Sequence, residues 1–115
     1  MAVRILHNPR CSKSRATLAL LQDRGHHPEI QLYLESPPDH QELKSILGKL
    51  GMNARELMRR GESEYAMLSL ADESLSEDEL IAAMVAHPRL IERPIVLANG
   101  KAAIGRPPES VLDIL

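Results

Sequence analysis

The stretch VRILHNPRCSKSRATLALLQDRGHHPEIQLYL, residues 3–34, decides the fold. It begins with a short apolar run at residues 3–7 that contains β-branched side chains and predicts a strand. Apolar residues at helical spacing then predict a helix from Ser12 or Ser14 to about Arg24, and alternating polar and apolar residues predict a second strand at 29–34. A strand, a helix and a strand in so short a stretch form a βαβ unit, with parallel strands and a right-handed crossover.

The middle of the chain has a helical pattern. It predicts three helices, at about residues 36–51, 53–61 and 76–88. Ser36 is the expected N-cap of the first, because it precedes a proline at the first helical position. Asn53 can cap the second, and the capping box Ser76-Glu-Asp-Glu79 starts the third. Residues 62–75 show no clear pattern.

The C-terminal part predicts a β-hairpin followed by a helix. Residues 94–98 are an apolar run typical of a strand, and Asn99-Gly100 is the strongest short signal for a hairpin turn. Residues 101–104 are then the antiparallel return strand. A final helix is expected to begin near Pro107.

The complete order of elements is β-α-β, several helices, then β-β-α. Without the middle helices this is the thioredoxin-type layout. We therefore expect an α/β protein with a thioredoxin-like fold and a mixed central sheet. The length of 115 residues predicts a single domain over residues 1–115, with a helical insertion at about 37–90.

The composition excludes several classes of protein. The chain has one cysteine, two aromatic residues and a formal net charge of −2. One cysteine forms neither an internal disulfide nor a cysteine-rich metal site, so we expect no metal. Few aromatic side chains and a net charge near zero argue against nucleic-acid binding through base stacking. No apolar run is long enough for a membrane span or a signal peptide, so we expect a cytoplasmic protein with no membrane association.

Cys11 is the candidate nucleophile. It follows the first predicted strand, at the carboxyl end where α/β proteins present reactive groups. The N–H groups and dipole of the following helix stabilise a thiolate, which is the nucleophilic form. Arg10, Lys13 and Arg15 add positive charge. A lone cysteine can also be an inert buried side chain, but so polar and basic a segment favours the reactive role.

Arginine usage is the second signal. Ten arginines stand against four lysines, and arginine is suited to bidentate binding of oxyanions. Arg93 and Arg106 each precede a proline in a predicted loop, so either can be directed at a ligand with little loss of entropy, although loop arginines are often merely exposed. His7 ends the strand that leads to Cys11, where it can support the thiolate, orient the loop or simply bond to backbone. Together these residues predict an oxyanion-binding thiolate site, which fits phosphatase-like and arsenate-directed chemistry.

The run from His7 to Arg15, HNPRCSKSR, resembles the active-site loop of the glutaredoxin-coupled arsenate reductase (ArsC) family. The resemblance continues in family order over essentially the whole chain, in the segments LYLESPP at 32–38, RELMR at 55–59, HP at 87–88, RPIV at 93–96, RP at 106–107 and VLDIL at 111–115. The chain resembles the short members of the family, which lack a longer basic C-terminal tail.

The resemblance implies roles for individual residues. Cys11 matches the catalytic cysteine of the family. The three arginines that hold arsenate and its thiol adduct match Arg59, Arg93 and Arg106. His7 and Ser14 match residues that support the thiolate, to which Arg15 adds positive charge. Pro94 matches the cis-proline of thioredoxin folds.

The resemblance also implies a mechanism. The Cys11 thiolate attacks arsenate, and water leaves as a thiol–arsenate ester forms. Reduction of As(V) to As(III) takes two electrons, so a chain with one cysteine needs a second thiol from outside. Glutathione supplies it and leaves a mixed disulfide on Cys11, which glutaredoxin resolves. We therefore expect a monomer for arsenic detoxification, with arsenate as substrate, glutathione as co-substrate, glutaredoxin as partner and no bound cofactor.

Two alternatives stay open. A glutathione-dependent thiol oxidoreductase of the same fold would act on another substrate. A non-catalytic regulator of the Spx type would bind RNA polymerase, but its redox-sensing members use Cys-x-x-Cys, whereas Ser14 stands at the second position here. A phosphatase is disfavoured, because cysteine phosphatases have a longer loop than the spacing from Cys11 to Arg15.

Overall fold

The computed structural model describes residues 2–115. The chain forms two compact units. The sheet unit consists of the residues up to Ser36 together with Arg93–Leu115, and the helical unit is Pro37–Glu92. The helical unit therefore covers the expected insertion at about 37–90 and extends to Glu92. The assignment of the whole chain to a single domain stays a prediction.

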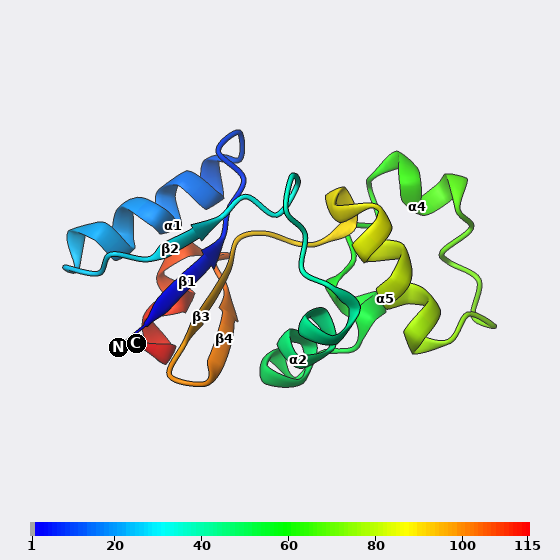
Figure 1. Cartoon of the computed structure of the whole chain (residues 1–115). Coiled ribbons are helices and arrows are strands. Elements are labelled where there is room, and N and C mark those ends of the chain that lie inside the picture. Colours follow the sequence, from blue (N-terminus) through cyan, green and yellow to red (C-terminus); the bar gives the residue numbers. More distant parts are fainter. Residues whose placement is uncertain (1) are drawn as a thin grey trace. The chain divides into compact units, whose positions relative to one another are not determined.

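The sheet unit contains a four-stranded sheet with helices packed against it (Figure 1). Its elements are β1 (Val3–Leu6), α1 (Ser12–Asp23), β2 (Glu29–Gln31), β3 (Ile95–Ala98), β4 (Lys101–Ile104) and the 3₁₀ helix η2 (Pro108–Ile114). The strand order is β2-β1-β3-β4. β1 pairs in parallel with β2 and antiparallel with β3, and β3 pairs antiparallel with β4. The mixed sheet and the thioredoxin-like fold are thus confirmed.

The apolar faces of β1, α1 and η2 form the core of the sheet unit. Val3 and Ile5 of β1 pack with Leu21 of α1 and with Val111 and Ile114 of η2. These side chains are aliphatic, and their burial stabilises the folded state by about 25 cal/mol per Å² of apolar surface removed from water. The core holds α1 against the sheet, and it thereby fixes the position of the loop between β1 and α1.

The predicted hairpin turn is confirmed, and the first helix ends close to the predicted residue. Asn99 and Gly100 have φ values of 55° and 72°, the left-handed conformation that a tight two-residue hairpin turn requires, and they join β3 to β4. Gly25 has φ of 82° directly after the end of α1. Asparagine and glycine tolerate these values with less strain than other residues do.

The helical unit consists of short helices. They are α2 (His40–Leu50), α3 (Ala54–Leu57), α4 (Ser63–Met67), α5 (Glu77–Ala86) and the 3₁₀ helix η1 (Pro88–Leu90). α2 packs on α5 through the buried stripes that include Leu43 and Ile81. The caps predicted at Asn53 and Ser76 are both formed, and each is a capping box.

The predicted end of the second strand is wrong. β2 ends at Gln31 rather than residue 34, because the chain turns at Leu32, whose carbonyl accepts from Glu35 and Ser36 N–H. The final helix begins at Pro108, as expected, and is a 3₁₀ helix. α4 occupies part of the stretch in which no pattern was recognisable.

The first helix of the helical unit begins three residues later than expected. Asp39, not Ser36, is its N-cap, and the Asp39 side chain accepts from Glu42 N–H at 2.8 Å. The physical reason lies in the two prolines between them. A residue that precedes proline is disfavoured in the helical conformation, so Pro38 keeps Pro37 extended and delays the helix.

No helix within residues 2–115 is long and apolar enough to cross a membrane. Over the same residues, no group of three or more histidine, cysteine, aspartate or glutamate side chains is placed to hold a metal ion.

We expect Asp39→Ala to lower the free energy of unfolding by about 1 kcal/mol, because it removes the side chain that caps α2. Ser36→Ala is the matched control and should leave stability unchanged. Urea unfolding followed by circular dichroism measures both. A larger loss for Ser36→Ala would contradict the assignment of the cap.

Candidate active site

The loop between β1 and α1 is closed by its own hydrogen bonds. Asn8 organises it, since its side-chain Oδ1 accepts from Arg10 N–H and its carbonyl accepts from Cys11 N–H, each at 3.0 Å. At the start of the loop, His7 N–H donates to Gln31 carbonyl at 2.9 Å, which extends the pairing of β1 with β2. The turn that follows β1 therefore places Cys11 immediately before the first residue of α1.

Cys11 is the N-cap of α1. Its backbone is extended, with φ of −93° and ψ of 123°, and its carbonyl accepts the first helical bond from Arg15 N–H. The residue is 8% exposed. Its thiol thus lies at the positive end of the helix dipole, a position that favours an anion.

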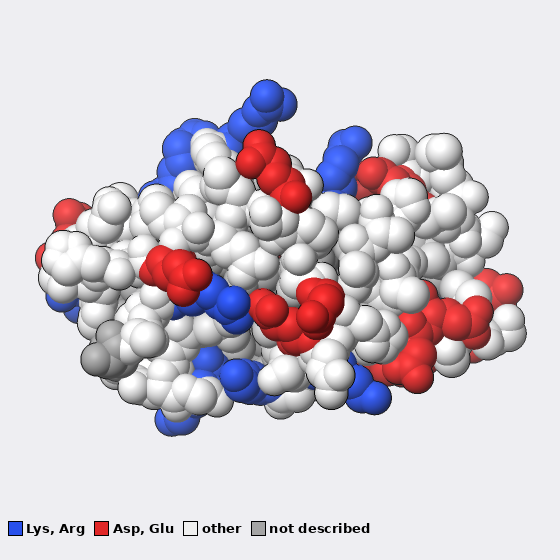
Figure 2. Space-filling model, viewed as in Figure 1, with Lys and Arg blue, Asp and Glu red and all other residues white. Residues whose placement is uncertain are grey.

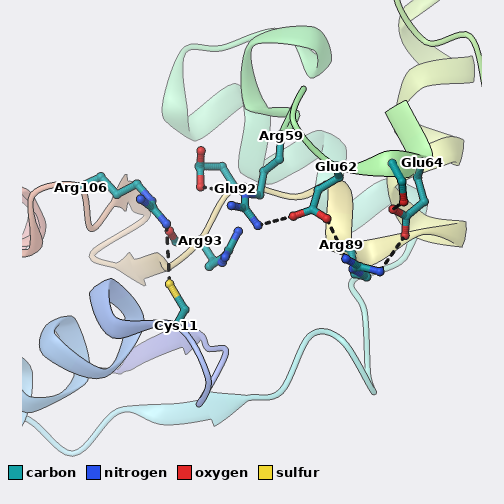
Figure 3. A network of polar contacts seen from close by, with 9 residues as sticks. Cys11, Arg59, Glu62, Glu64, Arg89, Glu92, Arg93 and Arg106 are labelled. Carbon is teal, nitrogen blue, oxygen red and sulfur yellow. Dashed lines mark hydrogen bonds and ion pairs between the residues drawn. The ribbon is translucent and has the colours of Figure 1, made fainter. Parts of the chain in front are cut away.

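Arg106 is the side chain that the structure places on this thiol. Its Nη2 lies 3.7 Å from Cys11 Sγ, within hydrogen-bond distance for sulfur, as Figure 3 shows. Its Nε donates to the Arg93 carbonyl at 2.8 Å. The second contact fixes the guanidinium plane, so that the group facing the sulfur is held by a backbone atom of the neighbouring loop.

Arg93 and Pro94 form the loop beside Arg106. The bond between Arg93 and Pro94 is cis, as the resemblance implies, and the bond between Arg106 and Pro107 is cis as well. Arg93 is only partly exposed, and its Nε and Nη1 atoms are buried. The sheet unit therefore brings together Cys11, Arg106 and the loop that carries Arg93.

Gly105 allows this loop to approach α1 closely. A Cβ at this position would lie 2.8 Å from Cγ of Pro94 and would collide with Oγ1 of Thr17. Gly105 is buried, and its N–H donates to Pro94 carbonyl at 2.9 Å. Only glycine fits between the proline loop and the helix that Cys11 caps.

His7 and Ser14 form a buried polar pair behind the loop. His7 Nδ1 lies 2.6 Å from Ser14 Oγ, and Asn8 N–H donates to the same oxygen at 3.0 Å. Ser14 is fully buried. Burial, with the positive charge of Arg15 in second place, lowers the pKa of His7 below its usual value of 6.5, so the ring is neutral at neutral pH. The pair therefore stabilises the loop by hydrogen bonding and not by a histidine charge.

Arg15 is exposed and does not reach the sulfur through any contact that the structure shows. Its Nη1 donates to the Pro9 carbonyl at 2.9 Å. Basic side chains gather on the surface over this end of α1 (Figure 2). The support of the thiolate by Arg15 stays a prediction of long-range charge.

Arg59 belongs to the helical unit, where it lies among carboxylates. Its Nη1 is 2.7 Å from Glu62 Oε1, and its Nε is 3.7 Å from Glu92 Oε1. Its backbone N–H donates to the Leu90 carbonyl at 2.8 Å. The binding of an oxyanion by Arg59, Arg93 and Arg106 together stays a prediction from the resemblance.

A small pocket of about 230 Å³ lies against the reactive loop. It is lined by His7, Pro9 and Arg10 of the loop and by Leu32, Leu34 and Glu35 after β2. Both leucines are exposed, at 37% and 39%. The pocket therefore places two apolar side chains beside the reactive loop.

Several residues of this site could not be recognised from the sequence. Asn8 was part of the run that resembles the family loop, but no role was predicted for it, although Asn-Pro is a turn signal. Gly105 and the carboxylates around Arg59 were missed. Glu62, at i+3 from Arg59, is the one of these that spacing could have indicated.

The fold and the site together define a thioredoxin-like protein with one thiol at a helix N-terminus and an arginine facing the sulfur. Comparison with known proteins specifies the family. The model of the ArsC family matches residues 6–114, and the chain belongs to this family.

Relatives cover the whole chain. It is 63% identical to the YfgD protein of Escherichia coli over 98% of this chain and 96% of that protein. It is 53% identical to an arsenate reductase of Neisseria meningitidis over 98% of this chain and 97% of that protein. The solved structure of an arsenate reductase from Vibrio cholerae superposes with a TM-score of 0.97 at 55% identity, over 100% of this chain and 98% of that one.

We expect Gly105→Ala to lower the free energy of unfolding by about 1–3 kcal/mol, because the new methyl group displaces Thr17 or Pro94. Gly48→Ala, in the last turn of α2 with open space around it, is the control and should stabilise by about 0.5–1 kcal/mol. Denaturant unfolding distinguishes the two signs. Equal effects would contradict the close approach at Gly105.

The lowered pKa of His7 predicts a pH dependence of stability. Between pH 6.5 and the lower pKa of the folded state, the unfolded chain binds more protons than the folded one, so the free energy of unfolding falls as the pH falls through this window. His7→Gln should reduce this dependence, whereas the exposed His27→Gln should keep it. Urea midpoints at pH 7.5 and 5.5 test this, and an unchanged dependence in His7→Gln would assign the effect elsewhere.

Proposed function

We propose that this chain is an arsenate reductase, an oxidoreductase in which Cys11 is the nucleophile, glutathione supplies the second thiol and glutaredoxin resolves the product. The observation that carries the proposal is the contact of Arg106 Nη2 with Cys11 Sγ at the N-terminus of α1. A guanidinium and a helix dipole at one sulfur stabilise a thiolate and then an oxyanion bonded to it. The names of the relatives agree with this substrate.

The proposed reaction begins with attack of the Cys11 thiolate on arsenic. An S–As bond forms, an As–O bond breaks, and the leaving oxygen departs as water after protonation. Arg106 and Arg93 balance the charge of the adduct in this proposal, with Arg59 as the third arginine. His7 is neutral, so it holds Ser14 and the loop but adds no charge.

The reduction proper takes place when glutathione attacks the Cys11 sulfur. An S–S bond forms as the S–As bond breaks, and its electron pair stays on arsenic, which is reduced from As(V) to As(III) and leaves as arsenite. The two sulfurs are together oxidised by two electrons. Among the residues of this chain, Cys11 is the only cysteine, so the disulfide joins it to glutathione. Thiol–disulfide exchange with glutaredoxin returns the thiolate.

A coupled assay tests the proposal. NADPH oxidation in the presence of glutathione, glutaredoxin and glutathione reductase should depend on arsenate for the native chain and should be absent for Cys11→Ser. Arg106→Ala should lower kcat/KM by about 100-fold, because it removes a donor to the sulfur and the oxyanion. Arg24→Ala, an exposed arginine at the end of α1, is the matched control and should keep native activity.

Two results would contradict the proposal. No arsenate-dependent oxidation at millimolar arsenate would overturn the proposal. Equal losses in Arg106→Ala and Arg24→Ala would mean that the anion site lies elsewhere.

A second candidate is a glutathione-dependent oxidoreductase that acts on an organic disulfide. The pocket against the reactive loop favours this candidate. The apolar side chains of Leu32 and Leu34 can contact an organic substrate, whereas an inorganic oxyanion gains no binding energy from them. The same coupled assay with hydroxyethyl disulfide in place of arsenate tests this candidate. Turnover of the disulfide without turnover of arsenate would establish it in place of the first proposal.

A further inference from the structure

The backbone of Arg59 is held by a short antiparallel pairing inside the helical unit. Met58 and Ile91 form an isolated β-bridge, Arg59 N–H donates to the Leu90 carbonyl at 2.8 Å, and Glu92 N–H donates to the Leu57 carbonyl at 3.1 Å. This pairing fixes the Cα of Arg59. It does not fix the long side chain, whose rotamers require a further constraint.

Glu62 supplies that constraint. Its Oε1 accepts from Arg59 Nη1 at 2.7 Å, the length of a charge-assisted hydrogen bond. Glu92 lies 3.7 Å from Arg59 Nε, which is an ion pair but too long for a hydrogen bond. The Glu62 and Arg59 side chains are 17% and 28% exposed, so water screens this pair less than it screens an ordinary surface salt bridge.

Glu62 is itself held from the other side. Its second oxygen, Oε2, accepts from Arg89 Nη2 at 2.9 Å, and Arg89 Nη1 lies 3.7 Å from Glu64 Oε2. Figure 3 shows the row in which Glu62 lies between the two guanidinium groups. Because both carboxylate oxygens are engaged, rotation of Glu62 would break two ion pairs at once. The carboxylate is therefore a fixed point against which Arg59 is oriented.

The net charge of these arginines and glutamates shows that they do not act by attracting an anion. Three carboxylates face the guanidinium groups of Arg59 and Arg89, and these are the carboxylates of Glu62, Glu64 and Glu92. The cluster thus supplies no excess of positive charge to draw in an anion. A guanidinium has five N–H donors, so the bond at Nη1 leaves the donors on Nη2 for a second acceptor.

We propose that Glu62 is a positioning residue, which holds Arg59 by Nη1 so that Nη2 is presented to an oxyanion, and that Arg89 acts on Arg59 through Glu62. The inference rests on the proposed function, in which Arg59 contacts the oxyanion. It adds a carboxylate to a site otherwise described by its arginines.

Kinetics in the coupled assay test the positioning role. Glu62→Ala should lower kcat/KM for arsenate about tenfold, mainly through KM, because one charge-assisted hydrogen bond is lost. Glu62→Gln should recover most of the loss, since its amide oxygen still accepts from Arg59. Glu73→Ala, an exposed carboxylate of the same unit, is the matched control and should behave as the native chain.

A double-mutant cycle tests the path from Arg89. Arg89→Ala should cause a smaller loss than Glu62→Ala, and the double variant should be no worse than Glu62→Ala alone. Additive losses would assign Arg89 a role independent of Glu62 and overturn that part of the inference. Native or improved kcat/KM in Glu62→Ala, or no recovery in Glu62→Gln, would overturn the positioning role.

Direct binding separates this inference from the proposed function. Calorimetric titration of arsenate into Cys11→Ser, which cannot form the adduct, should show weaker binding by the same factor when Glu62→Ala is added. If the native chain does not turn over arsenate but this difference in binding is present, the proposed function fails and the positioning role stands. Absence of arsenate binding to Cys11→Ser would overturn the positioning role.

Discussion

One buried hydroxyl group holds the reactive loop in shape. Ser14 Oγ contacts His7 Nδ1 and accepts from Asn8 N–H, so the end of β1 and the first turn of α1 are tied to the same atom. A buried polar group without partners would destabilise the fold, and here two groups satisfy one another. The position of the Cys11 thiol depends on this link, because it ties the end of β1 to the first turn of α1, which Cys11 caps.

The arginines of the chain differ in what holds them. Arg106 is oriented by a backbone carbonyl of the neighbouring loop, whereas Arg59 is oriented by a carboxylate. The first arrangement leaves the full charge of the guanidinium to its ligand, and the second partly neutralises it. Acidic side chains also gather over the first turn of α5 (Figure 2), where their negative charge stabilises the positive end of the helix dipole. The near-neutral net charge is therefore an average over regions of opposite sign.

Local signals predicted the parts of the fold that local physics determines. Asn99-Gly100 forms the hairpin turn, Ser76 forms its capping box, and the βαβ unit has parallel strands. The error at Ser36 arose because the conformational effect of Pro38 outweighs the cap. In the site, Cys11 and Arg106 could be named from sequence, but the Arg106–Cys11 contact joins residues 95 positions apart and no spacing rule describes it.

That separation has a consequence for the newly made chain. The helix, its basic residues and the thiol are synthesised first, because the guanidinium that faces the sulfur lies 95 positions after Cys11. A nascent chain therefore carries its thiol without the partner that stabilises the charged form. Arg106 lies two residues after β4, so the pairing of β4 with β3 that completes the sheet also brings Arg106 toward Cys11.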